Sequence, residues 1–246
     1  MDYDKDFESG FEQTSLGAIH YLRHKGHGNK MIFLHGLGAS TLTWKRLVAF
    51  LDEGLDITLI DLLGHGESDA PKIDYTISVQ FQALREVISL QNNGDSFLFG
   101  NSYGGWVAAY YASQPYTCKG IILESPAGLK ENFDDIVAAG KEQQFKEDSL
   151  RIAMQYENNE WVLKSIINAD FEEDQLTTET LSKIKKPTLI LWGSEDTTID
   201  KKYAAMFNSK IKGSELEIMQ GVGHVPHYTN PEETAAIIRR FIASVS

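Results

Sequence analysis

SFLFGNSYGG, residues 96–105, decides the fold of this chain of 246 residues. Its first half is an apolar run typical of a buried parallel strand, and Ser102–Ser113 has a helical composition. A Gly-x-Ser-x-Gly sequence between a strand and a helix predicts a sharp turn, in which Gly100 and Gly104 leave room for neighbouring backbone. Such a turn holds its serine above the carboxyl edge of the sheet, so Ser102 is the candidate nucleophile.

A second glycine-containing turn, HGLG at residues 35–38, follows the apolar run Met31–His35. When a serine attacks an ester, the carbonyl oxygen becomes negatively charged, and two backbone N–H groups can stabilise it. We expect these N–H groups to belong to Tyr103, directly after the serine, and to Leu37 in this turn. The residues predicted to line the substrate pocket are His35, Gly36, Trp161 and Val225.

A serine nucleophile needs a base, which is normally a histidine, and the chain has seven histidines. His224 follows the predicted strand Glu215–Met219 through a glycine-containing turn, which places it at the sheet edge that carries Ser102. We therefore predict that His224 is the base. His227, three residues later, is the alternative.

The base in turn needs a carboxylate that fixes its tautomer and stabilises the imidazolium ion. Asp196 comes shortly after the apolar run Thr188–Trp192 and is the predicted acid, whereas its neighbour Glu195 is expected to point away. Glu124 ends the run Ile121–Glu124 and is the alternative, because that strand end also borders the site.

These motifs resemble those of the α/β-hydrolase superfamily, in its branch of single-domain esterases and carbon–carbon-bond hydrolases. The chain order Ser102, Asp196, His224 is the order found in that fold. DLLGHGES at residues 61–68 is similar to a conserved loop of the family, and GHVPH at residues 223–227 is similar to its histidine loop. The resemblance implies an α/β-hydrolase fold, with a mostly parallel central sheet flanked by helices.

Apolar runs alternate with helical stretches along most of the chain, as the fold requires. Residues 126–187 break this rhythm, because three helical stretches occur there without a strand. They predict a small helical cap of residues 128–185, inserted into a core of residues 1–127 and 186–246. The predicted helices of the cap are Glu131–Gln144, Asp148–Glu157 and Trp161–Ile167. An antiparallel pair is expected in residues 11–24. The predicted core strands that follow it are Met31–His35, Ile57–Asp61, Ser96–Gly100, Ile121–Glu124, Thr188–Trp192 and Glu215–Met219.

The formal net charge of −12 disfavours a nucleic-acid partner, because phosphate binding needs a basic face. The single cysteine, Cys118, excludes an internal disulfide. The acidic N-terminus lacks the layout of a secretory signal, and no apolar run reaches the roughly 18 residues of a membrane span. We expect a soluble, cytoplasmic protein without a membrane partner. Serine chemistry needs neither metal nor organic cofactor, so the expected partner is a small-molecule ester.

Three functions fit these residues. The first is a hydrolase of carboxylic esters, which we favour. The second is a hydrolase of carbon–carbon bonds in ring-fission products, because the Gly-Asn-Ser of residues 100–102 resembles the serine turn of those enzymes. Two features argue against it: Val225 stands where those enzymes carry tryptophan, and Arg151 is the only arginine of the insertion. The third is a ligand receptor that keeps the pocket without catalysis. Relatives that cleave carbon–halogen bonds or epoxides carry aspartate at the position of Ser102.

Overall fold

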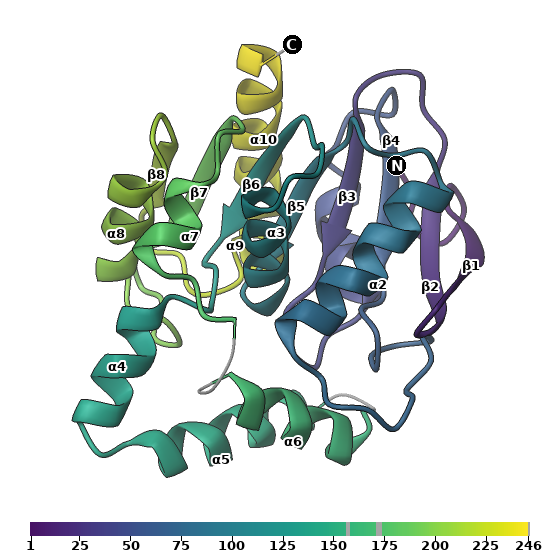
Figure 1. The fold of residues 1–246 in the computed structure, drawn as a ribbon. Coiled ribbons are helices and arrows are strands. Elements are labelled where there is room, and N and C mark those ends of the chain that lie inside the picture. The colour runs from purple at the N-terminus through teal and green to yellow at the C-terminus, as the bar shows by residue number, and fades with distance from the viewer. Residues whose placement is uncertain (156–157, 171–173, 246) are drawn as a thin grey trace.

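The computed structural model describes residues 1–155, 158–170 and 174–245. A sheet of eight strands in the order β1-β2-β4-β3-β5-β6-β7-β8 runs through the molecule (Figure 1). β1 and β2 are antiparallel, and the strands from β4 to β8 are parallel, which confirms the predicted mostly parallel sheet. The strands are β1 (Glu8–Thr14), β2 (Gly17–His24), β3 (Lys30–Leu34), β4 (Asp56–Ile60), β5 (Phe97–Asn101), β6 (Gly120–Glu124), β7 (Thr188–Gly193) and β8 (Glu215–Met219).

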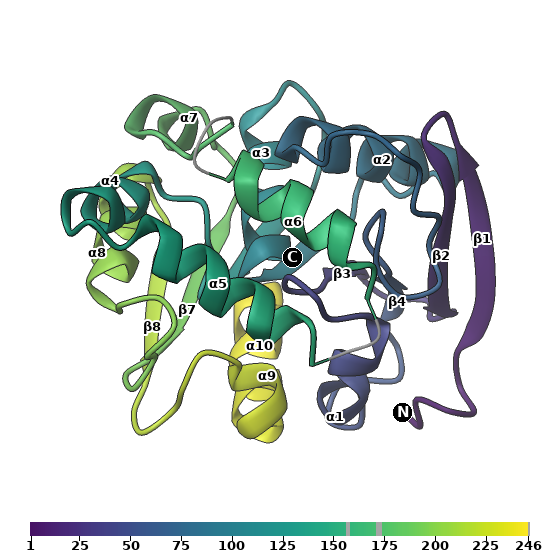
Figure 2. The ribbon, with the colours of Figure 1, turned by 90° about the horizontal axis from the view of Figure 1, so that it is seen from below.

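Helices cover both faces of this sheet: α2, α3, α7 and α8 pack on one face, and α1 and α10 on the other (Figure 2). No helix in the described ranges is long and apolar enough to cross a bilayer. The helices are the 3-10 helix η1 (Thr41–Trp44), α1 (Lys45–Val48), α2 (Ile77–Leu90), α3 (Tyr103–Ser113), α4 (Lys130–Ala138), α5 (Glu142–Ala153), α6 (Glu160–Ala169), α7 (Thr178–Ser182), α8 (Lys202–Lys210), α9 (Pro226–Thr229) and α10 (Pro231–Val245).

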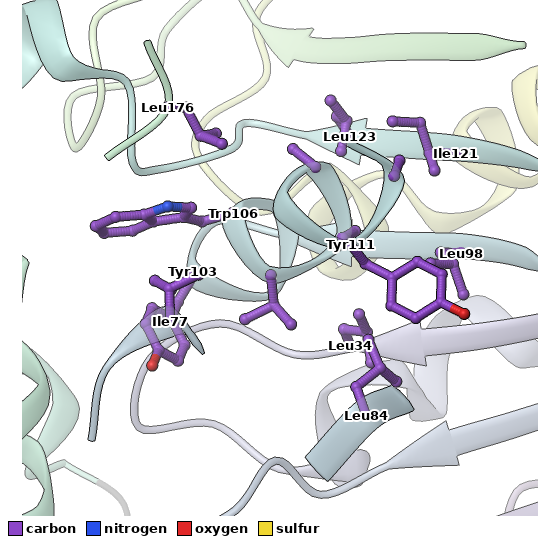
Figure 3. Packing of buried hydrophobic residues seen from close by; sticks show 14 of the residues in the cluster. Leu34, Ile77, Leu84, Leu98, Tyr103, Trp106, Tyr111, Ile121, Leu123 and Leu176 are labelled. Carbon is purple, nitrogen blue, oxygen red and sulfur yellow. The ribbon is translucent and has the colours of Figure 1, made fainter. Parts of the chain in front are cut away.

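Two apolar clusters, one on each face of the sheet, form the core. In β5, Leu98 belongs to the cluster that contains Trp106 of α3, which Figure 3 shows from close by. Phe97 and Phe99 belong to the other cluster, with Phe241 of α10. Because both faces of the strand are buried, its sequence is a continuous apolar run without the alternation of a half-exposed strand.

The helices α4, α5 and α6 lie across one edge of the sheet (Figure 1). The predicted helix Glu131–Gln144 is wrong in its extent, because the chain turns at Gly140, whose φ of 64° lies in the left-handed region. α5 begins after that turn and includes the start of the predicted helix Asp148–Glu157, whose last two residues lie outside the described residues. The boundaries of the cap, residues 128 and 185, stay a prediction.

Candidate active site

Ser102 occupies the turn between β5 and α3 in a conformation that few residues adopt. Its φ is 51° and its ψ is −114°, a strained combination for a residue with a side chain. Its N–H donates to the carbonyl oxygen of Glu124 on β6, at 2.9 Å. A Cβ at Gly100 would collide with the carbonyl oxygen of Gly104, and one at Gly104 with that of Leu34. The glycines are therefore required by the close approach of backbone around the serine.

His224 and Asp196 meet at the ends of two neighbouring strands, β8 and β7. The Nδ1 of His224 lies 2.8 Å from the Oδ2 of Asp196. The other carboxylate oxygen, Oδ1, accepts from the N–H groups of Thr198 and Ile199 at 2.8 and 2.9 Å. These bonds hold the carboxylate in one orientation, as an acid that aligns a histidine must be held.

The electrostatics of this pair favour an ionised carboxylate. Burial alone would raise the pKa of Asp196, but the hydrogen bond and charge of His224 act against it, with help from the two backbone N–H groups. The net effect holds the pKa of Asp196 below its ordinary value. The Asp196 side chain is fully covered, whereas His224 keeps 17% of its side chain exposed and reaches the cavity.

Glu124 and His227, the two alternatives from the sequence, contact each other instead. The Oε1 of Glu124 accepts from the backbone N–H of His227 at 2.8 Å, and its Oε2 contacts the Nδ1 of the same residue. Both side chains are buried, and His227 reaches Thr43 with its Nε2 at 2.9 Å from the threonine Oγ1. His227 does not line the cavity that holds Ser102. This geometry favours His224 and Asp196 as the base and its acid.

The buried glutamate also connects the serine turn to the histidine loop. The Nδ2 of Asn101 donates to the Oε2 of Glu124 at 2.9 Å and lies 3.3 Å from the carbonyl oxygen of His224. Glu124 therefore touches both the residue before the nucleophile and the loop of the base. Sequence reasoning considered Glu124 only as an acid, and its pairing with His227 has no local sequence signal because the two lie 103 residues apart.

Leu37 and Tyr103 lie beside Ser102 and line the same cavity. A Cβ at Gly36 would come within 3.5 Å of the Ser102 Cβ, so the turn packs directly on the serine. Within the part of the chain that the structure describes, neither Leu37 N–H nor Tyr103 N–H donates a hydrogen bond. Tyr103 is the first residue of α3, where backbone N–H groups point out of the helix with a partial positive charge. Both N–H groups thus remain available as donors to a bound ligand, and their role as an oxyanion site stays a prediction.

A cavity of about 210 Å³ contains Ser102 and His224. Its walls come from the turn after β3, the serine turn, the histidine loop and the cap helices. Gly36 and Val225, both predicted pocket residues, line it. The cap contributes the apolar side chains of Phe133, Phe145, Ile152 and Ala153 and the polar side chains of Asn132, Ser149 and Asp170.

Asp170, at the end of α6, is the one acidic residue among the described wall residues of this cavity. Desolvation raises the pKa of Asp170 to about 8, and the positive charge of Lys146 opposes this rise only in part. Its carboxyl group is therefore mostly protonated at neutral pH. Asp170 lies beyond the predicted helix Trp161–Ile167, at the start of an acidic stretch of the sequence, and nothing there indicated that it lines the cavity.

Two predicted pocket residues do not line this cavity. The ring of His35 is fully buried. Both of its nitrogens are satisfied inside the protein, since Nε2 accepts from the Leu62 N–H at 3.0 Å and Nδ1 donates to the Gly36 carbonyl at 2.8 Å. Trp161 packs edge-on against Tyr75, with ring centroids 5.6 Å apart, and is not among the described residues that line the serine cavity. Both side chains serve packing rather than the pocket.

The family model described as the alpha/beta hydrolase family matches residues 31–237. The chain belongs to the alpha/beta hydrolase family. The resemblance inferred from its motifs is thereby confirmed, and with it the fold.

Relatives within the alpha/beta hydrolase family include lipases and esterases. A monoacylglycerol lipase of Xenopus laevis is 26% identical over 259 residues, which cover 89% of this chain and 77% of the relative. A solved membrane phospholipase A, described as a bacterial virulence factor, superposes with a TM-score of 0.78 at 25% identity, covering 98% of this chain and 87% of that one. A serine hydrolase involved in carbazole degradation has a TM-score of 0.80 at 23% identity over 97% and 99% of the two chains, a likeness of fold. Similarity to hydrolases of this kind supports a general hydrolase activity for this chain.

Proposed function

We propose that this chain is a serine hydrolase that cleaves small to medium carboxylic esters through an acyl-enzyme on Ser102. One observation carries the proposal. Ser102 and His224 line the same cavity, and the Oδ2 of a buried, ionised Asp196 lies 2.8 Å from the Nδ1 of the His224 ring. That arrangement matches the roles of nucleophile, base and orienting acid.

The proposed reaction uses only these groups and water. The Oγ of Ser102 attacks the ester carbonyl carbon while His224 takes the hydroxyl proton, and the N–H groups of Leu37 and Tyr103 stabilise the oxyanion. The carbon–oxygen bond to the alcohol then breaks, and His224 returns its proton to the departing alkoxide. A water molecule then attacks the acyl-enzyme while His224 takes one of its protons, the bond between the acyl carbon and Oγ breaks, and His224 passes that proton to Oγ, which releases the acid and restores Ser102.

The residues of the cavity wall support ester hydrolysis over the hydrolysis of carbon–carbon bonds. Arg151 pairs with Asp148 on the exposed side of α5, at 2.9 Å, and does not line the cavity. The described walls therefore hold no arginine for the acidic group of a ring-fission product. An apolar wall with a protonated Asp170 suits an uncharged acyl group better.

A fluorophosphonate label followed by turnover of nitrophenyl esters tests the proposal. Stoichiometric labelling with ester turnover, both lost in Ser102→Ala, supports a serine esterase. Labelling without turnover of any ester would point to a receptor that retains the site. Cleavage of a dienoic ring-fission product with no ester turnover would establish the carbon–carbon alternative.

A further inference from the structure

The serine cavity is small compared with sites that enclose a whole drug-sized ligand. Its volume of about 210 Å³ lies below the roughly 300 Å³ at which sites for drug-sized ligands begin. The acyl and alcohol parts of an ester extend in different directions from the carbonyl carbon. If the cap side chains enclose one part, the other must leave the cavity.

A second cavity, which we call the outer cavity, adjoins the first. Its volume is about 490 Å³, and it shares the wall residues Ala39, Thr43 and Val225 with the serine cavity. Its remaining walls come from η1, α1 and α9. Leu42 and Tyr228 at its rim are 58% and 42% exposed, so the outer cavity opens to solvent.

The position of the outer cavity matches the exit of the alcohol. In acyl transfer the histidine that receives the serine proton passes it to the leaving oxygen, so the alcohol lies on the histidine side of the site. Val225 directly follows His224 and lines both cavities. An alcohol bonded to the carbonyl carbon beside His224 therefore extends past Val225 into the outer cavity.

The outer cavity carries a positive charge that the protein does not neutralise. Lys45 pairs with Asp4 at 2.6 Å. Arg46, beside it, lies over the ring of Tyr228 at 4.1 Å and donates to the Tyr228 carbonyl oxygen at 3.3 Å. Among the described residues no carboxylate lies within 4.0 Å of Arg46. In a chain of net charge −12, an arginine held in place without an acidic partner is a local site for an anion.

We propose that the outer cavity binds the leaving alcohol of the substrate, and that Arg46 selects alcohols that carry an anionic group such as a carboxylate or phosphate. The inference rests on the proposed esterase function and adds the substrate class. The balance of the reaction is unchanged: Ser102 gains the acyl group, and the alcohol leaves with the serine proton delivered by His224. Its anionic group stays paired with Arg46 until the alcohol dissociates.

Two matched acetate esters test the inference. One is 4-acetoxybenzoate, whose leaving phenol carries a carboxylate, and the other is 4-acetoxybenzamide, whose leaving phenol is neutral. The measured quantity is the ratio of their kcat/KM values. Exposed ion pairs contribute up to about 1 kcal/mol, so Arg46→Gln should lower this ratio about fivefold at low salt. Arg46→Glu should lower it further, and Arg46→Lys should retain most of it.

Arg85→Gln is the matched control. Arg85 also lies over a tyrosine ring, that of Tyr116 at 5.7 Å, and its removal changes the net charge equally, away from both cavities. It should leave the ratio unchanged, and added salt should reduce the ratio in the wild type but not in Arg46→Gln. If both esters are turned over and Arg46→Gln leaves their ratio unmoved, or Arg85→Gln moves it equally, the inference is wrong while the esterase function stands. Turnover of neither ester, without fluorophosphonate labelling, overturns both.

Discussion

The Nδ1 of His224 lies 2.8 Å from the Oδ2 of Asp196, although the two residues are 28 positions apart in the chain. The contact follows from topology, because β7 and β8 are parallel neighbours and each residue comes from the loop at the same end of its strand. Ser102 comes from the same edge through β5. Parallel pairing thus brings three distant segments to one cavity.

The ranking of two acids tests this relationship. Asp196→Asn should lower kcat by about four powers of ten, because the amide stabilises the wrong tautomer of His224. Glu124→Gln should cost much less, since Glu124 contacts His227 and Asn101 rather than His224. Steady-state kinetics of both variants with one nitrophenyl ester give the comparison. A larger loss in Glu124→Gln would assign the acid to β6.

Ser102→Ala and His224→Ala should not be additive. Nucleophile and base act as a unit, so the double variant should lose little more kcat than either single variant. Removing one oxygen at the turn should leave the fold intact, which circular dichroism can check. Losses that multiply would mean that the two residues act in separate steps.

The stability of the protein should depend on the ionisation of Asp170. Its pKa is raised to about 8 in the folded state, whereas an unfolded aspartate titrates near about 3.9. Between these values the folded state holds a proton that the unfolded state releases, so this group lowers the free energy of unfolding as pH rises through that window. Asp170→Asn removes the effect.

Thermal melts of wild type and Asp170→Asn across that pH window measure it. The advantage of the variant in Tm should grow from about pH 4 to about pH 8 and then level off. Asp170→Ala is a second comparison, because it removes the same charge without an amide. A constant difference between wild type and both variants would show that Asp170 is ionised throughout.

The cap should limit the length of the acyl group. Phe133, Phe145 and Ile152 line the serine cavity, and the volume of about 210 Å³ leaves no room for a long chain. Across nitrophenyl esters from acetate to palmitate, kcat/KM should therefore be highest for the short esters. Ile152→Ala, which enlarges the cavity, should shift the optimum to longer chains. Fastest turnover of laurate or palmitate by the wild type would mean that the cavity opens into a long groove.

The sequence could predict those parts of the site that local chemistry determines. A glycine-flanked serine between a strand and a helix predicts the sharp turn that holds Ser102. The carboxyl ends of parallel strands meet at one edge of the sheet, so Asp196 and His224 could be placed near Ser102 from the sequence. Gly36, Leu37 and Val225, which were predicted from the same turns, line the cavity that holds Ser102.

Side-chain direction could not be predicted in this way. His35 precedes the turn of Leu37, but its ring points into the protein toward Leu62. Trp161 lies on the apolar helix α6, and the sequence does not show what its side chain contacts. In the structure it packs on Tyr75 and does not line the serine cavity. The outer cavity depends on how α1 and α9 meet, and no local pattern links Arg46 with Tyr228, which lies 182 residues away.

The most direct test of the account is the capture of the acyl-enzyme. The protein is mixed with 4-nitrophenyl butanoate, quenched in acid before steady state, and analysed by intact mass and peptide mapping. The account predicts a burst of nitrophenol equal to the enzyme concentration, with one butanoyl group on Ser102 and none in Ser102→Ala. Turnover without an adduct, or an adduct on another residue that survives Ser102→Ala, would contradict the assignment of Ser102 as the nucleophile.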